Sequence, residues 1–576
     1  MLANQIGYYS LILGLLLSVL LCGVSIKDFN KTNKQINQNI LSLSFLQLVF
    51  VIVSFLSLII SFINSDFSNE TVFNNSHTTK PLFYKISGTW GNHEGSLLLW
   101  LLVLTLFIFL FLIKSREQPK KYRILTLLFQ QIIIIGFFLF VLMTSNPFNY
   151  LFPIPNEGLG LNPILQDPAL AIHPPILYLG YVGTSIIFSS SLAAVTQNYV
   201  TKEWGQHIKK WVLVSWIFLT IGIMLGSIWA YYELGWGGFW FWDPVENVSL
   251  MPWLALTTLL HCILVLERKS ILSSWVIILS IATFTLSMCG TFLVRSGILN
   301  SVHTFANDPE RGLFILIFLF ILIFLSLFVF FFFHKNEQKV SHRFFWLSKE
   351  TSILINNWFM MYFLSVVLIG TVYPIFLDVI TSKKISVGPP FYNKLLVPFL
   401  IPFLLMMAVG PRLKWIKSQL EGKIYLITLL IISILLAYLI LKNFNQNILI
   451  NTVDENIAIL ETDSEHNFAE GDDIDIIIDP DDNLTETVYY VSKKKYQEVN
   501  LIPLRFNGNL NDTGIGSSNM VGLGRDYVGG EYQDVELVFS DYTNVRDGVG
   551  DIGDAGNAKA TVTVGNDNFE SSILLI

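Results

Sequence analysis

The chain has 576 residues, of which 53% are apolar, 14% aromatic and only 14% charged. Soluble domains carry about 25% charged residues, so this composition excludes a conventional soluble enzyme. The net charge of -7 conceals a division: residues 451–576 hold 25 acidic and 7 basic side chains, whereas residues 1–450 hold 29 basic and 18 acidic ones.

Long apolar stretches predict the fold class. A membrane span needs ~20 mostly apolar residues. Twelve stretches meet this requirement, near residues 8–25, 41–63, 95–113, 124–144, 175–195, 212–232, 250–266, 273–293, 313–333, 356–377, 394–410 and 424–441. The first lacks a preceding basic region and a cleavage site, so we expect a retained helix rather than a signal peptide. We therefore predict an all-α polytopic membrane protein with about 12 transmembrane helices in residues 1–445, followed by an acidic non-membrane tail, β or disordered, in residues 446–576.

Loop charges predict the orientation. The loops after the odd-numbered spans carry 21 Lys and Arg residues, and those after the even-numbered spans carry 6. Because positive loops stay in the cytoplasm, the N-terminus, the loop at 233–249 and the tail are expected on the opposite side, the periplasm in a bacterium.

Two histidines lie in predicted outer loops. His173 is found within Ala-Ile-His-Pro-Pro just before the fifth span, and His303 within Ser-Val-His-Thr-Phe after the eighth. Histidines from separate loops at equal depth can meet on opposite faces of one planar macrocycle. For either residue taken alone, an exposed loop histidine is the simpler interpretation.

The strongest signal is the loop between the sixth and seventh spans. It combines large aromatic rings with glycines and acids: Trp236, Gly237, Phe239, Trp240, Phe241, Trp242, Asp243, Glu246 and Asn247. An interfacial aromatic belt accounts for only one or two of these tryptophans. Glycines permit close backbone approach, and flat rings can stack on a large flat ligand. The acids would fix the ligand's register or simply cap the next helix.

One histidine lies well inside a span. His261 is interpreted either as a neutral core histidine bonded to a neighbouring helix or as an axial ligand of a buried haem.

The three cysteines, Cys22, Cys262 and Cys289, lie in apolar runs and indicate neither a disulfide framework nor a zinc site.

Further polar groups cluster at the outer face. Trp90–Ser96 reads as a turn and helix cap, with Glu94 complementing the helix dipole. Arg295 and Arg311 flank the His303 loop and would pair with porphyrin propionates or anchor the interface.

These motifs together resemble a known family. The run Trp236–Asn247 is similar to the tryptophan-rich signature of haem-handling proteins in cytochrome c biogenesis. With Trp90–Ser96, Leu161–Asp167, Ala171–Tyr178, Gly290–Gly297 and Ser301–Phe305, residues 1–425 resemble the haem lyase subunit of System I, the CcmF family.

The resemblance implies a mechanism. A membrane-embedded haem b would be held by two histidines, one corresponding to His261, and a second haem would arrive from a haem chaperone and be held by His173 and His303 beneath the tryptophan-rich loop. The lyase would add the thiols of an apocytochrome CxxCH motif, brought by thiol-presenting subunits, across the haem vinyl groups. The embedded haem would pass an electron, with quinol as a candidate donor, to keep the substrate iron reduced. Lipid is expected as a partner and nucleic acid is not.

The sequence departs from the family after about residue 441, where further spans with the second embedded-haem histidine would follow. The last histidine, His466, lies in an acidic stretch that cannot be a buried helix. Either another polypeptide supplies the missing part, or the tail reflects a gene fusion, a frame change or a misassembled sequence; we favour the second class. Within the tail, Ile474–Pro480 and Val535–Phe539 have strand character.

Three functions compete. The first is a haem lyase in a bacterial plasma membrane or mitochondrial inner membrane. The second is a haem exporter or carrier without ligation activity. The third, a proton-pumping respiratory subunit, needs charged residues in the middle of several spans, and this chain offers essentially one histidine.

Overall fold

The computed structural model describes residues 2–160, 166–233, 238–295, 309–334, 345–381 and 387–415, three residues between 432 and 436, and seven strands between 448 and 572. The chain divides into two compact units, Met1–Leu430 and Ile431–Ile576. His303, Trp236 and Gly237, three residues expected at the functional site, lie outside the described ranges.

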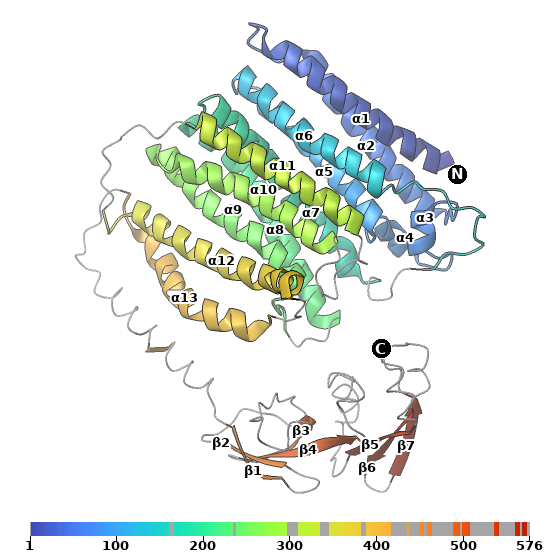
Figure 1. Cartoon of the computed structure of the whole chain (residues 1–576). Helices are drawn as coiled ribbons and strands as arrows, with labels where there is room; N and C mark the ends of the chain where they lie inside the picture. Colours follow the sequence, from blue (N-terminus) through green and yellow to red (C-terminus); the bar gives the residue numbers. More distant parts are fainter. Residues whose placement is uncertain are drawn as a thin grey trace. The chain divides into compact units, whose positions relative to one another are not determined.

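The first unit is a bundle of long helices, seen lying side by side in Figure 1. Its helices are α1 (Leu2–Phe29), α2 (Gln38–Ile63), α3 (Glu70–Asn75), α4 (Leu82–Gly88), α5 (His93–Lys114), α6 (Lys120–Thr144), α7 (Pro168–Thr196), α8 (Lys202–Glu233), α9 (Pro244–Lys269), α10 (Ser273–Arg295), α11 (Pro309–Phe333), α12 (Lys349–Thr381) and α13 (Pro389–Val409), followed by a 3₁₀ turn at Gly410–Arg412.

Eleven helices in the described part of the chain are long and apolar enough to cross a membrane. They coincide with the first eleven predicted spans, which confirms an all-α polytopic membrane protein. The twelfth predicted span, residues 424–441, lies almost entirely outside the described residues.

Two segments expected as loops are helical instead. The segment before the third span contains the short helices α3 and α4. α7 begins at Pro168, because the Asp167 carboxylate caps it by accepting from Leu170 N at 2.9 Å and proline suits the first helical position. His173 therefore lies in the second turn of a helix rather than in a loop.

α7 is central to the bundle, with 78% of its most apolar window buried. It packs closely on α8 because both helices carry glycine at the contact. A Cβ added at Gly222 would lie 2.6 Å from the Leu177 Cα, and one added at Gly180 would collide with the backbone of Leu219. Small residues allow such approach between membrane helices, where dispersion contacts rather than hydrophobic exclusion drive association.

Neutral polar side chains join helices inside the bundle. The Gln47 and Gln131 amides exchange hydrogen bonds of 3.1 and 3.0 Å between α2 and α6, and Gln130 donates to Ser185 on α7 at 2.9 Å. Each of these three buried glutamine amides thus has a partner on another helix, as the low-polarity surroundings require.

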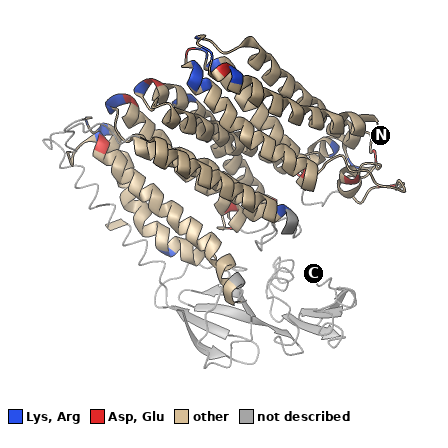
Figure 2. Cartoon of the chain, turned by 45° about the horizontal axis from the view of Figure 1, so that its top comes forward, with Lys and Arg blue, Asp and Glu red and all other residues tan. Residues whose placement is uncertain are grey.

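Charged residues gather mostly at one end of the bundle (Figure 2). Lys27, Lys114, Arg268 and Lys269 occupy the last turns of α1, α5 and α9. This distribution is the one expected of a cytoplasmic end.

The second unit contains strands β1 (Ile448–Val453), β2 (Ala458–Thr462), β3 (Val488–Lys495), β4 (Glu498–Phe506), β5 (Val535–Ser540), β6 (Lys559–Val564) and β7 (Asp567–Ser572). Their order is β1-β2-β4-β5-β6-β7, with β3 also paired to β4. All neighbouring strands pair antiparallel except β4 and β5. β5 contains the predicted Val535–Phe539 strand, whereas Ile474–Pro480 lies outside the described residues.

Candidate functional site

The aromatic loop ends in a tightly capped helix. Asp243 is the N-cap of α9 and accepts from Val245 N at 2.9 Å, while the Glu246 carboxylate accepts from Phe241 N at 3.0 Å and Asp243 N at 3.1 Å. This is a capping box with one additional backbone bond. The capping interpretation of these two acids is thus confirmed.

Trp242 connects the loop to α13. Its indole ring stacks on Tyr392 with centroids 4.7 Å apart and planes 13° apart, and its Nε1 donates to Asn393 Oδ1 at 3.2 Å. Asn247 strengthens the junction by donating to Trp242 O at 2.9 Å and Tyr392 OH at 3.0 Å. Trp242 has a positive φ of 58°, a conformation that non-glycine residues adopt only where surrounding contacts hold it.

The other rings of the loop have different neighbours. Phe239 stacks on Tyr231 of α8 at 4.3 Å, and Trp240 meets Trp242 edge-on at 6.0 Å and 87°. The Trp240 Nε1 atom is buried and has no hydrogen-bond partner among the described residues. An indole N–H left without an acceptor is costly unless a ligand supplies one.

His173 is held at the contact between α7 and α8. Its Nδ1 lies 2.6 Å from the Gly222 carbonyl oxygen, and a Cβ at Gly226 would lie 2.7 Å from the His173 Cε1 atom. A carbonyl can only accept, so Nδ1 carries the proton and Nε2 carries the lone pair of the neutral ring. Histidines that bind metals through Nε2 have this arrangement, because the carbonyl fixes tautomer and orientation.

The N-terminus of α5 is positioned by its own sequence motif. Asn92 caps the helix by accepting from Gly95 N at 2.7 Å, and Gly95 leaves no room for a side chain against Thr89 O. Trp90 Nε1 donates to Ala171 O at 2.9 Å, two residues before His173. The predicted helix cap is therefore also a contact to the His173 helix.

Arg295 is buried against this motif, only 3% exposed. Nη1 donates to His93 Nδ1 at 3.0 Å and His93 O at 3.1 Å, and Nη2 donates to Ser96 Oγ at 2.6 Å and Tyr178 OH at 3.1 Å. These four bonds use the four Nη hydrogens. Arg295 thus joins α10 to α5 and α7.

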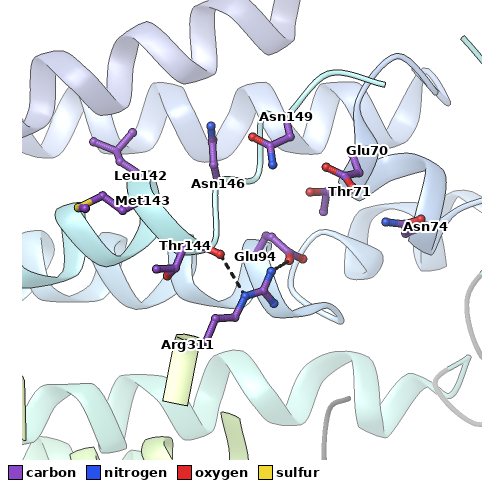
Figure 3. A pocket seen from close by; sticks show the side chains of 10 residues that line it. All are labelled: Glu70, Thr71, Asn74, Glu94, Leu142, Met143, Thr144, Asn146, Asn149 and Arg311. Atoms are coloured by element: carbon purple, nitrogen blue, oxygen red, sulfur yellow. Dashed lines mark hydrogen bonds and ion pairs between the residues drawn. The ribbon is translucent and has the colours of Figure 1, made fainter. Parts of the chain in front are cut away.

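Arg311 makes the equivalent contact from α11 (Figure 3). Its Nη2 lies 2.9 Å from Glu94 Oε1, and its Nε donates to Thr144 O at 3.1 Å. This ion pair borders a polar cavity of about 300 Å³ that Glu70 and Asn146 also line. The two residues that flank the His303 segment are therefore both bound to α5.

His261 lies at a different depth in the bundle from His173. It is 17 residues after Pro244 on α9, roughly 26 Å along the axis, whereas His173 is five residues after Pro168 on the parallel helix α7. His261 Nδ1 lies 3.2 Å from Asn356 Nδ2 of α12, and Asn357 donates to Cys262 Sγ at 3.0 Å. The structure does not bring the two histidines together.

Several partners could not be identified from the sequence. Tyr392 and Asn393 hold Trp242, Asn356 contacts His261 and Tyr178 binds Arg295. For Tyr392 and Asn393, the sequence shows only that an aromatic and an amide residue lie just after the two prolines that start α13. In the described part of the chain no three His, Cys, Asp or Glu residues form a metal-binding group.

Comparisons with known proteins agree with this architecture. The family description "Cytochrome C assembly protein" matches residues 90–299. The chain is 47% identical over 416 residues to the cytochrome c-type biogenesis protein CycK of Bradyrhizobium diazoefficiens, covering 72% of this chain and 63% of CycK. It is 40% identical over 448 residues to the cytochrome c-type biogenesis protein CcmF of Haemophilus influenzae, covering 77% of this chain and 68% of that protein.

A solved structure, "Cytochrome c Heme Lyase CcmF", has the same fold, with a TM-score of 0.61 and 22% identity over 87% of this chain and 94% of that chain. The chain spans a little less than two thirds of the length of CycK and just over two thirds of the length of the Haemophilus protein. The chain therefore belongs to the CcmF family of cytochrome c-type biogenesis proteins.

Proposed function

We propose that this chain is the haem lyase subunit of a cytochrome c biogenesis system. It would bind haem at the outer face of the inner membrane and join it through thioether bonds to the CxxCH motif of apocytochrome c. The observation that carries the proposal is the 2.6 Å contact between His173 Nδ1 and Gly222 O, which places the proton on Nδ1, so that Nε2 would be the ligating nitrogen. The names of the relatives support the process, and the name of the structural neighbour supports the lyase activity.

Two features of the described residues support a haem at the proposed outer site. His173 supplies an oriented imidazole, and the buried Trp240 Nε1–H supplies a donor suited to a propionate carboxylate. The proposed site also includes Phe239, Trp242 and Asp243 and, outside the described ranges, Trp236, Gly237 and His303. His303 is proposed as the second ligand of the outer haem iron.

Arg295 belongs to this site through positioning. Because its four Nη hydrogens bind His93, Ser96 and Tyr178, a propionate contact through both Nη atoms would have to displace these partners. We assign Arg295 the role of holding α10 against α5, next to the Trp90 contact that holds the start of α7. Catalysis would then depend on a rigid frame that brings the vinyl groups and the thiols together, rather than on a catalytic acid or base.

His261 is the proposed ligand of an embedded haem b. A haem there would supply one-electron chemistry that keeps the substrate iron reduced, with quinol as the candidate donor. Ligation through Nε2 requires a proton on Nδ1. The Asn356 side chain can provide the acceptor. Rotation of its amide by about 180° exchanges Nδ2 and Oδ1, so that the oxygen would accept the proton of His261 Nδ1.

The partners follow from the proposed reaction. A haem chaperone would deliver haem, and thiol-presenting subunits would bring apocytochrome c to the outer face. The basic end of the bundle supports an orientation with the aromatic loop, the N-terminus and the tail on the periplasmic side. The alternative, a haem carrier, would use the same outer site without forming a covalent bond.

Covalent haem on a CxxCH substrate distinguishes the two functions. The chain would be co-expressed with its chaperone and an apocytochrome in a host without its own lyase, and haem staining would follow denaturing electrophoresis. Stained cytochrome that is lost in His173→Ala and retained in His77→Ala supports the lyase, because His77 is an outer-loop histidine paired with Glu157. Haem bound by the chain but never covalently attached to the substrate would favour the carrier.

A further inference from the structure

A second cavity lies at the basic end of the bundle, opposite the proposed outer haem site. It has a volume of about 810 Å³ and is lined by the last residue of α5, the first turns of α8 and the last turn of α9. Its lining includes five lysine and arginine side chains: Lys114, Lys202, Lys209, Lys210 and Arg268. Nothing in the proposed lyase reaction uses this cavity.

Cations outnumber acids in the lining of the cavity by five to three. Lys209 binds Glu267 at 2.7 Å. Among the described residues, the other four cations form no ion pair within 4.0 Å. Two more acids, Glu117 and Glu203, line the cavity, so cations remain in excess. A cavity of this charge favours an anion.

The backbone adds to this preference. α8 is 32 residues long and begins at Lys202, so its first turns present backbone N–H groups and the positive end of the helix dipole at the cavity. The charge of the cavity and the orientation of the helix therefore act in the same direction.

The position of the cavity identifies the source of the anion. All its lining helices contribute their end residues, and the lining includes Tyr199, a residue type that is enriched at membrane interfaces. Lysine side chains at such ends extend their ammonium groups to the headgroup level. Basic pockets between membrane helices on this side bind phosphate-bearing lipid headgroups.

We propose that this cavity binds the phosphate of an anionic phospholipid headgroup. Lys202 and Lys210 would contact the phosphate, with Lys114 and Arg268 completing the positive wall and the acyl chains lying between the helix ends and the bilayer. The inference does not depend on the lyase activity, because the lipid would bind at the end of the bundle opposite the outer haem site.

Lipid titration of the purified full-length chain tests the proposal. Phosphatidylglycerol and phosphatidylcholine would be titrated in detergent and counted by native mass spectrometry. Because a cation near the headgroup contributes about fivefold, Lys202→Gln combined with Lys210→Gln should weaken phosphatidylglycerol binding roughly 30-fold. The double arginine variant should restore binding, because it keeps both charges.

The control removes two exposed lysines at the same end that do not line the cavity, through Lys31→Gln and Lys34→Gln. This variant should bind phosphatidylglycerol like the parent chain. Equal binding of phosphatidylcholine, or equal loss in both glutamine variants, would overturn the proposal. Glycerol 3-phosphate binding as tightly as phosphatidylglycerol would assign the cavity to a soluble phosphate and also reject the lipid.

Discussion

The guanidinium of Arg295, the last residue of α10, donates to the ring Nδ1 of His93, the first residue of α5, over 3.0 Å. The next residue of α5, Glu94, binds Arg311 near the start of α11 at 2.9 Å. Two consecutive residues thus hold both flanks of the segment that carries His303. The motif at Trp90–Ser96 therefore contacts α7, which carries the proposed ligand His173. It also contacts the two residues that flank the segment of the other proposed ligand, His303.

Replacing Arg295 with glutamine should therefore reduce both stability and haem loading. Hydrogen bonds to charged groups contribute about 1.5–3 kcal/mol each, so the free energy of unfolding in detergent should fall by about 2 kcal/mol or more. Arg295→Lys keeps the charge but not the planar fork, and should recover only part of the loss. The exposed Arg116 at the opposite end offers a control, Arg116→Gln, that should leave both quantities unchanged.

Gly226→Ala should disturb His173 without removing it. The new Cβ would lie 2.7 Å from the His173 Cε1 atom, closer than side chains tolerate, so the imidazole must turn away from the Gly222 carbonyl. Outer haem loading, measured by absorbance after incubation with a haem-loaded chaperone, should fall at least tenfold. Gly23→Ala, where a Cβ has open space, should load normally. Normal loading in both variants would contradict the proposed orientation of His173.

Two conservative tryptophan variants should behave differently. Trp240→Phe keeps a ring but removes a buried N–H that has no partner in the described part of the chain, so it should weaken haem binding several-fold without lowering the free energy of unfolding by more than about 0.5 kcal/mol. Trp242→Phe loses the bond to Asn393 and part of the stack on Tyr392, so it should lower the free energy of unfolding by about 1 kcal/mol. Identical effects of the two changes would instead favour one common stacking surface.

Lys80 predicts a pH dependence of stability. Burial, reinforced by the nearby Lys85 charge, lowers the pKa of the Lys80 ammonium to about 8 from its usual 10.5. Between these values the unfolded chain binds more protons than the folded chain, so stability should rise as the pH increases from about 8 to 10.5. Lys80→Met should remove this rise, and Lys34→Met should retain it. A parallel pH profile for parent and Lys80→Met, measured by thermal unfolding in detergent, would refute the assignment.

The helices could be predicted from the sequence because each span must satisfy its own backbone in lipid. Eleven predicted spans are confirmed within the described ranges. The predicted start of α7 was less accurate. The two prolines after His173 favour a loop, whereas the Asp167 cap followed by Pro168 indicates that the helix begins before them. Capping by Asp243 and Glu246 was predictable for the same local reason, because the partners lie within five residues.

The remaining site contacts could not be predicted, because they join residues far apart in the chain. Trp242 and Tyr392 are 150 positions apart, and Arg295 and His93 are 202 apart. A sequence pattern identifies a buried arginine only as a cation near a helix end. It does not reveal whether the guanidinium meets a ligand or another helix.

The most direct test of the account is the visible spectrum of the haem-loaded chain with and without His173. We predict that the parent chain, reduced after loading from the chaperone, gives a low-spin spectrum with two histidine ligands at the outer site. In His173→Ala that signal should become high-spin or disappear, and exogenous imidazole should restore it, whereas His77→Ala should match the parent. An unchanged low-spin outer-site spectrum in His173→Ala would contradict the claim that His173 binds the haem to be ligated.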